Sequence, residues 1–231
     1  MKHFARYMAR ILMAPAPTLY GQGHQLRQSS QRTIKPLVGG VLVLDVLNTI
    51  DRHDGAGYDY LAPGYANIVD WFARAGTLDP DDALRLLRKA QKEPREAATV
   101  RKRAAALREA LAVIVSSMTM GQEVPAEALG TFNEESRHAR ANGTYIVSGG
   151  RLAWQWTQPH ALDRVLWEVC RSATGLLGSE RVARIRECAA PTCGSFFLDT
   201  SKNGSRQFCS ASTCGTATRV RRFRERQKSS V

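Results

Sequence analysis

Residues 186–227 read RECAAPTCGSFFLDTSKNGSRQFCSASTCGTATRVRRFRERQ and carry four of the five cysteines of the 231-residue chain. These four are Cys188, Cys193, Cys209 and Cys214, which form two close pairs, each with four intervening residues, separated by fifteen residues. Such paired spacing is typical of a tetrahedral Zn2+ site, in which four thiolates lie about 2.3 Å from the metal. The sequence therefore predicts a structural zinc ion held by these four residues.

The sequence leaves two other uses of the four cysteines open. Two disulfides would require an oxidising compartment, and no convincing secretory signal precedes this stretch. Four unrelated buried thiols would not be expected to fall into two equally spaced pairs. We therefore interpret the four cysteines as ligands of a structural zinc ion.

The residues around the cysteines predict the layout of this module. Asn203-Gly204 suits a tight turn with positive φ, so we expect a β-hairpin between the two cysteine pairs. After Cys214, apolar residues recur at Ala217, Val220 and Phe223, which is the spacing of one helix face. We expect this face to pack onto Phe196 or Phe197. The predicted order is a treble-clef-like or ribbon-like zinc finger followed by a basic helix.

The same stretch resembles the CGNR-type zinc finger found at the C-terminus of a bacterial family described as stress-induced transcription regulators. The four cysteines coincide with the four ligands of that family, and residues 197–201, FLDTS, match its hairpin. After Cys214-Gly215 the family has Asn-Arg, whereas this chain has Thr216-Ala217. Neither position supplies a ligand, so the resemblance still implies zinc binding, but a nucleic-acid contact by the missing Arg would be lost.

Charge is distributed unevenly along the chain, whose formal net charge is +12. Residues 1–44 hold six Lys and Arg and no acidic residue, residues 45–183 hold 17 basic against 18 acidic residues, and residues 184–231 hold ten against three. Basic ends favour a polyanion partner, because cations that contact phosphates release counterions. Such ends are also often solvated tails, and we expect residues 1–36 to be a flexible basic extension.

A compact apolar run, LVGGVLVLDVLNTID, follows at residues 37–51 and predicts a buried strand. Within it, Leu44 to Thr49 resembles the L-D-x-x-N-T signature that opens the N-terminal domain of the same regulator family. Asp45, Asn48 and Thr49 then form a polar corner, which together with Trp154 is our candidate ligand pocket. The alternative is that these polar residues cap the next element or tie down a loop.

Most of the remaining body reads as helices. Helices are expected over residues 66–75, 79–92, 125–142 and 160–179, with a longer helix after Pro94 whose apolar stripe runs from Val100 to Met118. An alternating hairpin is expected around Gly149-Gly150 over residues 144–157. Trp154 and Trp156 should share one face of this hairpin and pack on the strand predicted at Leu44. We expect an α+β, mostly helical fold with a sensing domain at residues 37–180, a small antiparallel sheet, and the finger at residues 181–231.

The basic helix supplies the candidate nucleic-acid contacts. Arginines that project from a helix can contact phosphates or read guanine edges in the major groove. The candidate residues on this helix are Arg219, Arg221, Arg222, Arg224 and Arg226, and Lys202 and Arg206, between the two cysteine pairs, are candidates for phosphate contacts. The predicted function is a cytoplasmic bacterial transcription regulator that binds double-stranded DNA through the finger and senses a ligand through its body.

Two other classes of function stay open. The finger could dock an acidic protein partner without binding DNA, or the helical body could hold an enzyme pocket that includes Asp45, Asn48 and Trp154. No convergent nucleophile and base are evident, and zinc with four cysteine ligands has no open position for catalysis. A small-molecule effector and a second copy of the chain are the further partners considered. No stretch approaches the roughly 20 apolar residues of a membrane-spanning helix.

Overall fold

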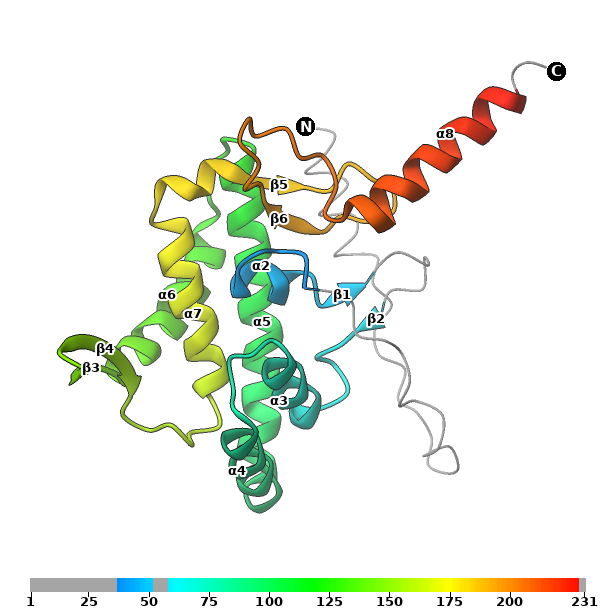
Figure 1. Ribbon diagram of the computed structural model, residues 1–231. Coiled ribbons are helices and arrows are strands. Elements are labelled where there is room, and N and C mark those ends of the chain that lie inside the picture. The colour runs from blue at the N-terminus through cyan, green and yellow to red at the C-terminus, as the bar shows by residue number, and fades with distance from the viewer. Residues whose placement is uncertain (1–36, 52–57, 229–231) are drawn as a thin grey trace, which may run out of the picture. The chain divides into compact units, whose positions relative to one another are not determined.

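The computed structural model describes residues 37–51 and 58–228, so the extension predicted at residues 1–36 lies outside the described residues. Helices make up most of the described chain (Figure 1). They are α2 (Leu42–Leu47), α3 (Tyr65–Arg74), α4 (Pro80–Lys92), α5 (Pro94–Thr119), α6 (Ala126–Ala141), α7 (Arg164–Leu177) and α8 (Thr216–Lys228). A 3-10 turn, η1 (Glu180–Arg184), and a π-helical turn, η2 (Ala211–Gly215), lie before and within the cysteine-rich region.

The strands of the described residues pair as three separate two-stranded antiparallel sheets. The pairs are β1 (Ile50–Asp51) with β2 (Tyr58–Asp59), β3 (Gly143–Ser148) with β4 (Arg151–Trp156), and β5 (Ile185–Glu187) with β6 (Phe196–Leu198). The predicted α+β, mostly helical class with small antiparallel sheets is therefore confirmed.

Helix α5 is the centre of the body, since α2, α3, α4, α6 and α7 all contact it. Its sequence explains this position, because apolar residues recur at three- and four-residue steps and form a stripe. Val100, Leu107 and Leu111 of the stripe are at most 2% exposed. Pro94 supplies the first residue of α5, where its missing N–H leaves no intrahelical bond unmade.

The starts and stops of the neighbouring helices follow their sequence signals. The carboxylate of Asp79 accepts a hydrogen bond from the backbone N–H of Asp82 at 2.8 Å and so caps α4. Gly76 follows α3 with φ of 73°, a conformation that favours glycine at a helix end. These two signals explain why the predicted bounds of α3 and α4 agree with the structure.

The strand predicted around Leu44 is wrong, because this segment forms helix α2. Val43, Leu44 and Val46 are 0–3% exposed, and α2 packs against α5, α7 and β6. A short apolar run that is buried on every side lacks the polar positions that distinguish a period of 3.6 from a period of 2. Tertiary packing therefore decides the conformation of this segment.

The hairpin predicted at residues 144–157 is confirmed as β3–β4, but its predicted contact with the Leu44 segment is not. Gly149 and Gly150 form the turn with φ of 55° and 74°. Trp154 and Trp156 share one face, and their rings meet edge to face at 5.3 Å between centroids. Trp156 then packs on Trp167 of α7 at 5.5 Å. The hairpin is thus attached to α7 rather than to α2.

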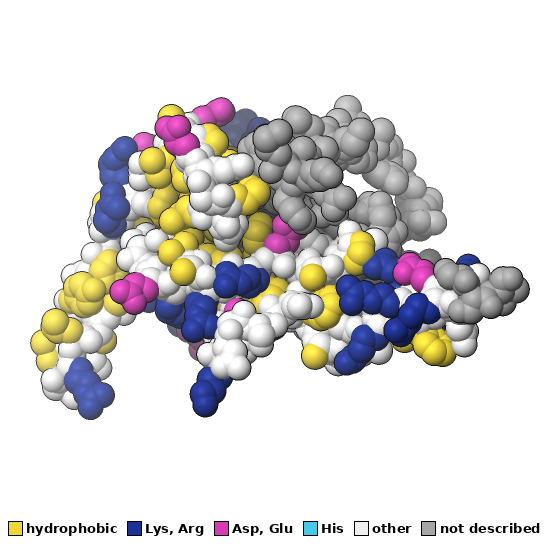
Figure 2. Space-filling model, turned by 90° about the horizontal axis from the view of Figure 1, so that it is seen from above, with side chains coloured by type: hydrophobic (Ala, Val, Ile, Leu, Met, Phe, Trp, Pro, Cys, Tyr) yellow, Lys and Arg dark blue, Asp and Glu magenta, His cyan; other side chains and the backbone are white. Residues whose placement is uncertain are grey.

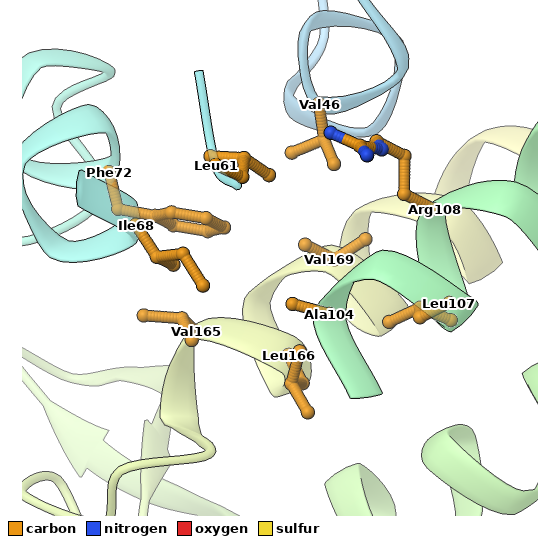
Figure 3. Close-up of a pocket in the computed structure, with 10 residues that line it drawn as sticks. All are labelled: Val46, Leu61, Ile68, Phe72, Ala104, Leu107, Arg108, Val165, Leu166 and Val169. Carbon is orange, nitrogen blue, oxygen red and sulfur yellow. The ribbon is translucent and has the colours of Figure 1, made fainter. Parts of the chain in front are cut away.

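The body encloses a small cavity between α2, α3, α5 and α7 (Figure 3). Its volume is about 10 Å³, which is close to the minimum for one water molecule. Nine of the ten lining side chains are apolar, and Arg108 is the exception. This core cavity is too small for an effector molecule.

Among the helices of residues 37–51 and 58–228, none combines the length and the apolar character needed to span a bilayer.

Candidate zinc centre and nucleic-acid surface

The four cysteines predicted as metal ligands come together in one buried cluster. Their Sγ atoms all lie within 4.8 Å of one another, and each residue is at most 6% exposed. Cys209 Sγ lies 3.6 Å from both Cys193 Sγ and Cys214 Sγ. Four thiolates at zinc-bond length from one ion would stand about 3.8 Å apart in a tetrahedron. The cluster therefore has the ligand type, the number and the separation that a structural zinc ion requires.

Within the cluster, neighbouring thiols perturb the pKa values of Cys193, Cys209 and Cys214. Hydrogen bonds from Cys188 and Cys209 lower the pKa of Cys193. Hydrogen bonds with Cys188 and Cys193 raise the pKa of Cys209. Burial raises the pKa of Cys214 to about 12. Thiolates this close repel one another, so all four can be ionised together only around a positive ion.

The backbone that presents the first two cysteines differs from the predicted hairpin. Strand β5 precedes Cys188 and pairs with β6, so the hairpin encloses the first cysteine pair instead of linking the two pairs. The turn at Asn203-Gly204 is present, with φ of 62° at Gly204, but residues 199–208 form a loop. Asp199 organises this loop, since it accepts hydrogen bonds from Ser201 and from the backbone N–H of Arg206. These bonds lower the pKa of Asp199.

Arg206, one of the predicted nucleic-acid contacts, has structural partners. Its guanidinium donates to the carbonyl oxygen of Phe208 at 2.9 Å and to that of Cys209. It also lies over the ring of Phe197, 4.4 Å from the centroid. Lys202, in contrast, is exposed in the same loop. We therefore assign Arg206 to holding the loop beside the cysteine cluster.

The finger is fastened to the body by Asn48, which was predicted to line a ligand pocket. The side-chain amide of Asn48 donates to the carbonyl oxygen of Phe196 and accepts from its N–H, both at 2.8 Å. The N–H of Leu198 donates to the carbonyl oxygen of Gly39 at 2.9 Å. Strand β6 thus uses its second edge to bind the segment around α2, and Val38 packs against the cysteine cluster.

Asp45 and Thr49 also have structural partners. Asp45 accepts a hydrogen bond from the N–H of Gly39 at 2.7 Å, and burial raises the pKa of this carboxyl group to about 6. Thr49 donates to the carbonyl oxygen of Val46 and accepts from Arg108 at 3.0 Å. Arg108 forms a bidentate pair with Asp59 at 2.6 and 2.7 Å. These residues tie down loops and helix ends, which was the alternative to the pocket.

Trp154 lies on β4 and is not brought together with the other three candidate pocket residues. It borders a cleft of about 460 Å³ between β4 and α7. The cleft is lined by Trp154, Gln155, Trp156, Thr157, Pro159, Arg164, Glu168 and Arg171. Glu168 accepts a hydrogen bond from Trp156 Nε1 at 2.7 Å, which fixes one wall of the cleft.

Helix α8 forms as predicted, but its apolar residues do not pack onto Phe196 or Phe197. Val220 is 43% exposed and Phe223 is 54% exposed, whereas Thr218 is the buried residue of the helix. α8 extends away from the rest of the finger (Figure 1). The predicted packing was wrong because helical spacing identifies an apolar face but not the residues that this face contacts.

The cationic residues predicted on α8 are all exposed. Arg221 lies 3.8 Å from Glu225, an ion pair between exposed groups that contributes little. Arg219 donates to the hydroxyl of Thr216 at 3.1 Å. Thr216, which stands where the family has Asn, therefore positions Arg219 one turn further along the helix.

One of these structural residues, Arg108, could have been recognised in the sequence, whereas Asn48 could not. Arg108 stands next to Leu107 in the apolar stripe of α5, and a buried cation requires a carboxylate partner. The pairing of Asn48 with Phe196 joins residues 148 positions apart, and no local pattern reports such a contact.

Family models match both the cysteine-rich finger and the helical body of the chain. Residues 184–227 match the model described as CGNR zinc finger, and residues 40–180 match the ABATE model, described as "Putative stress-induced transcription regulator". The second match covers more than half of the 231 residues, so the chain belongs to the ABATE family. No curated protein matches the chain. The CGNR match and the cysteine cluster together support a structural zinc ion.

Proposed function

We propose that this chain is a transcription regulator that binds double-stranded DNA through its zinc finger. The observation that carries the proposal is helix α8, which begins directly after the cysteine cluster and is exposed almost throughout. Its charged residues are Arg219, Arg221, Arg222, Arg224, Arg226, Lys228 and the single acid Glu225. Such an excess of cations on one exposed helix favours a polyanion, because each phosphate contact releases counterions.

Zinc has a structural role in this proposal. Four cysteine ligands leave no coordination position for a substrate or an activated water. The ion would fix the turn η2 on which α8 is mounted, because Cys214 lies within that turn. Neither matched family is a family of enzymes. A regulator of this kind acts in the cytoplasm, where bacterial DNA is located.

The body supplies the regulatory part of the proposed function. We place the effector site in the cleft between β4 and α7, because the core cavity among α2, α3, α5 and α7 has only about 10 Å³. Indole rings with a few polar side chains are typical of small-molecule sites. Asn48, which joins the body to β6, offers a route by which a change in the body reaches the finger.

A salt titration tests the proposal. The zinc-loaded chain should bind a random-sequence duplex, and its affinity should fall steeply with salt concentration. Replacing Arg219 and Arg222 together by Ala should reduce the slope of the logarithmic plot by about 2 if each arginine contacts one phosphate. Fluorescence anisotropy at several salt concentrations measures both quantities.

The matched control removes two exposed cations from the body, Lys92→Ala with Arg95→Ala. This control changes the net charge by the same amount as the Arg219/Arg222 variant. An unchanged salt slope in the control would therefore show that the cations must lie on α8 to contact phosphates. Absence of binding to any duplex at low salt would refute the proposal. It would favour the second candidate, a zinc-stabilised module that docks an acidic protein partner.

A further inference from the structure

The apolar and cationic residues of α8 occupy distinct positions around the helix axis, which a net positive charge alone does not require. Successive residues of an α-helix are separated by about 100° around its axis. Thr218, the buried residue, marks the side of α8 that faces the finger. Val220 and Phe223 lie about 160° and about 140° from Thr218, on either side of the direction opposite to it, and Gln227 falls between them at about 180°. We call these three residues the outer stripe.

Two rows of cations flank the outer stripe. Arg219, Arg222 and Arg226 lie on one side of it, and Arg221, Arg224 and Lys228 on the other, at about 70–130° from the centre of the stripe around the axis. Figure 2 shows dark blue side chains gathered along α8, with hydrophobic side chains among them. The face of α8 that points away from the protein therefore has an apolar centre and two cationic margins.

From this arrangement we infer that α8 enters the major groove of DNA with Val220 and Phe223 against thymine methyl groups. This inference rests on the proposed function and adds which residues read the bases. The major groove is about 12 Å wide, which fits a helix, and a phosphate chain borders it on each side. The two cationic rows match these two chains, and the outer stripe then faces the base edges.

The chemistry of the outer stripe selects A·T base pairs. Apolar side chains contact the thymine methyl group, which is the apolar group on the major-groove edge, and Gln can pair with adenine through N6 and N7. Nothing in the described chain covers Val220 or Phe223, which are 43% and 54% exposed. A second copy of α8 is a poor occupant, because each copy has six cations against one acid on this helix.

The test compares two duplexes of the same A·T-rich sequence, one with thymine and one with uracil in its place. Uracil lacks the methyl group but leaves the phosphates and the hydrogen-bonding groups unchanged. The zinc-loaded full chain should bind the thymine duplex about 3- to 10-fold more tightly than the uracil duplex at the same salt concentration.

Replacing Val220 and Phe223 together by Ala should abolish this difference without changing the salt slope. Ala has a higher helix propensity than Val or Phe, so a loss of preference cannot be attributed to a melted α8. Leu152→Ala is the matched control, because Leu152 is an exposed apolar residue on β4, at 73%, far in sequence from α8. It should retain the full preference for thymine.

The outcomes separate the inference from the proposed function. Equal binding of the wild-type chain to both duplexes overturns the inference and leaves DNA binding intact. An unchanged preference of the Val220/Phe223 variant for the thymine duplex has the same meaning. Absence of binding to either duplex at low salt refutes the proposed function itself. Binding to vesicles of anionic phospholipid that requires Phe223, without a thymine preference, would assign the outer stripe to a membrane surface and would also overturn the inference.

Discussion

The cysteine cluster and helix α8 are neighbours in the chain but differ in how the protein stabilises them. The four cysteines are at most 6% exposed and pack with Phe197, and β6 binds the body through Asn48 and Gly39. α8 buries Thr218 alone. An isolated helix of 13 residues is marginally stable in water.

This difference indicates which part of the finger serves the fold and which part serves a partner. Burial, hydrogen bonds and metal coordination all stabilise the cluster, so its residues have structural roles. Apart from Thr218, the side chains of α8 remain exposed, and nothing in the described chain buries its apolar residues.

Loss of one zinc ligand should have the largest effect. Replacing Cys209 by Ser is expected to remove the ion and to destabilise the finger by on the order of 10 kcal/mol. Because β6 is hydrogen-bonded to the segment around α2, the melting temperature of the body should fall as well. Metal analysis and thermal unfolding of the same sample measure both effects.

Cys170 provides the control for this experiment. It is 1% exposed, lies on α7, and its thiol is remote in sequence from the cluster. Burial raises the pKa of the Cys170 thiol to about 12, so it stays protonated. Cys170→Ala should keep its zinc. Full zinc content in Cys209→Ser would show that the assigned ligand set is wrong.

Removing the link between body and finger should have the next largest effect. Asn48→Ala leaves the N–H and the carbonyl oxygen of Phe196 buried without their partners, at a cost of about 3–4 kcal/mol. Denaturant unfolding measures this loss, and the exposed Asn133→Ala is the control. A loss below about 0.5 kcal/mol would mean that water or another group replaces the amide.

The third prediction concerns pH and Asp45. Burial raises the pKa of Asp45 from 3.8 to about 6 in the folded chain, so folding favours the protonated acid. The resulting stabilisation is complete below about pH 4 and disappears as the pH rises through about 6, and it amounts to at most about 3 kcal/mol. Asp59 works in the opposite direction: burial alone would raise its pKa, but the hydrogen bonds and charge of Arg108 lower it.

Comparison with Asp45→Asn isolates this group, because Asn does not titrate and all other groups are shared. Denaturant unfolding at pH 7, 5 and 4 should show the wild type gaining stability relative to the variant as the pH falls. A difference that is independent of pH would mean that Asp45 has an ordinary pKa in the folded chain.

The sequence predicted the elements whose signals are local. Asp79 and Gly76 mark helix ends, Gly149-Gly150 marks a hairpin, and the spacing of the cysteines identifies the metal site. Each of these signals depends on residues within one element or one turn. The helical class of the body and the zinc centre therefore followed directly from the sequence.

The errors occurred where distant contacts decide the structure. α2 was predicted as a strand because a run of six residues that is buried on every side has no distinctive period. Asn48 was assigned to a pocket because its partner, Phe196, lies 148 positions away. The direction of the apolar face of α8 was also not predictable, because the periodicity of one helix contains no information about its neighbours.

Hydrogen exchange of the full chain, free and bound to a duplex, tests the central claim most directly. The account predicts slow exchange for β5, β6 and the cysteine segment in both states, because zinc and burial stabilise them. It predicts fast exchange for the amides of α8 in the free protein and slow exchange once DNA is bound. Two results would contradict the account. In the first, the amides of α8 exchange as slowly as those of the cysteine segment in the absence of DNA. In the second, the exchange of α8 does not change when DNA binds.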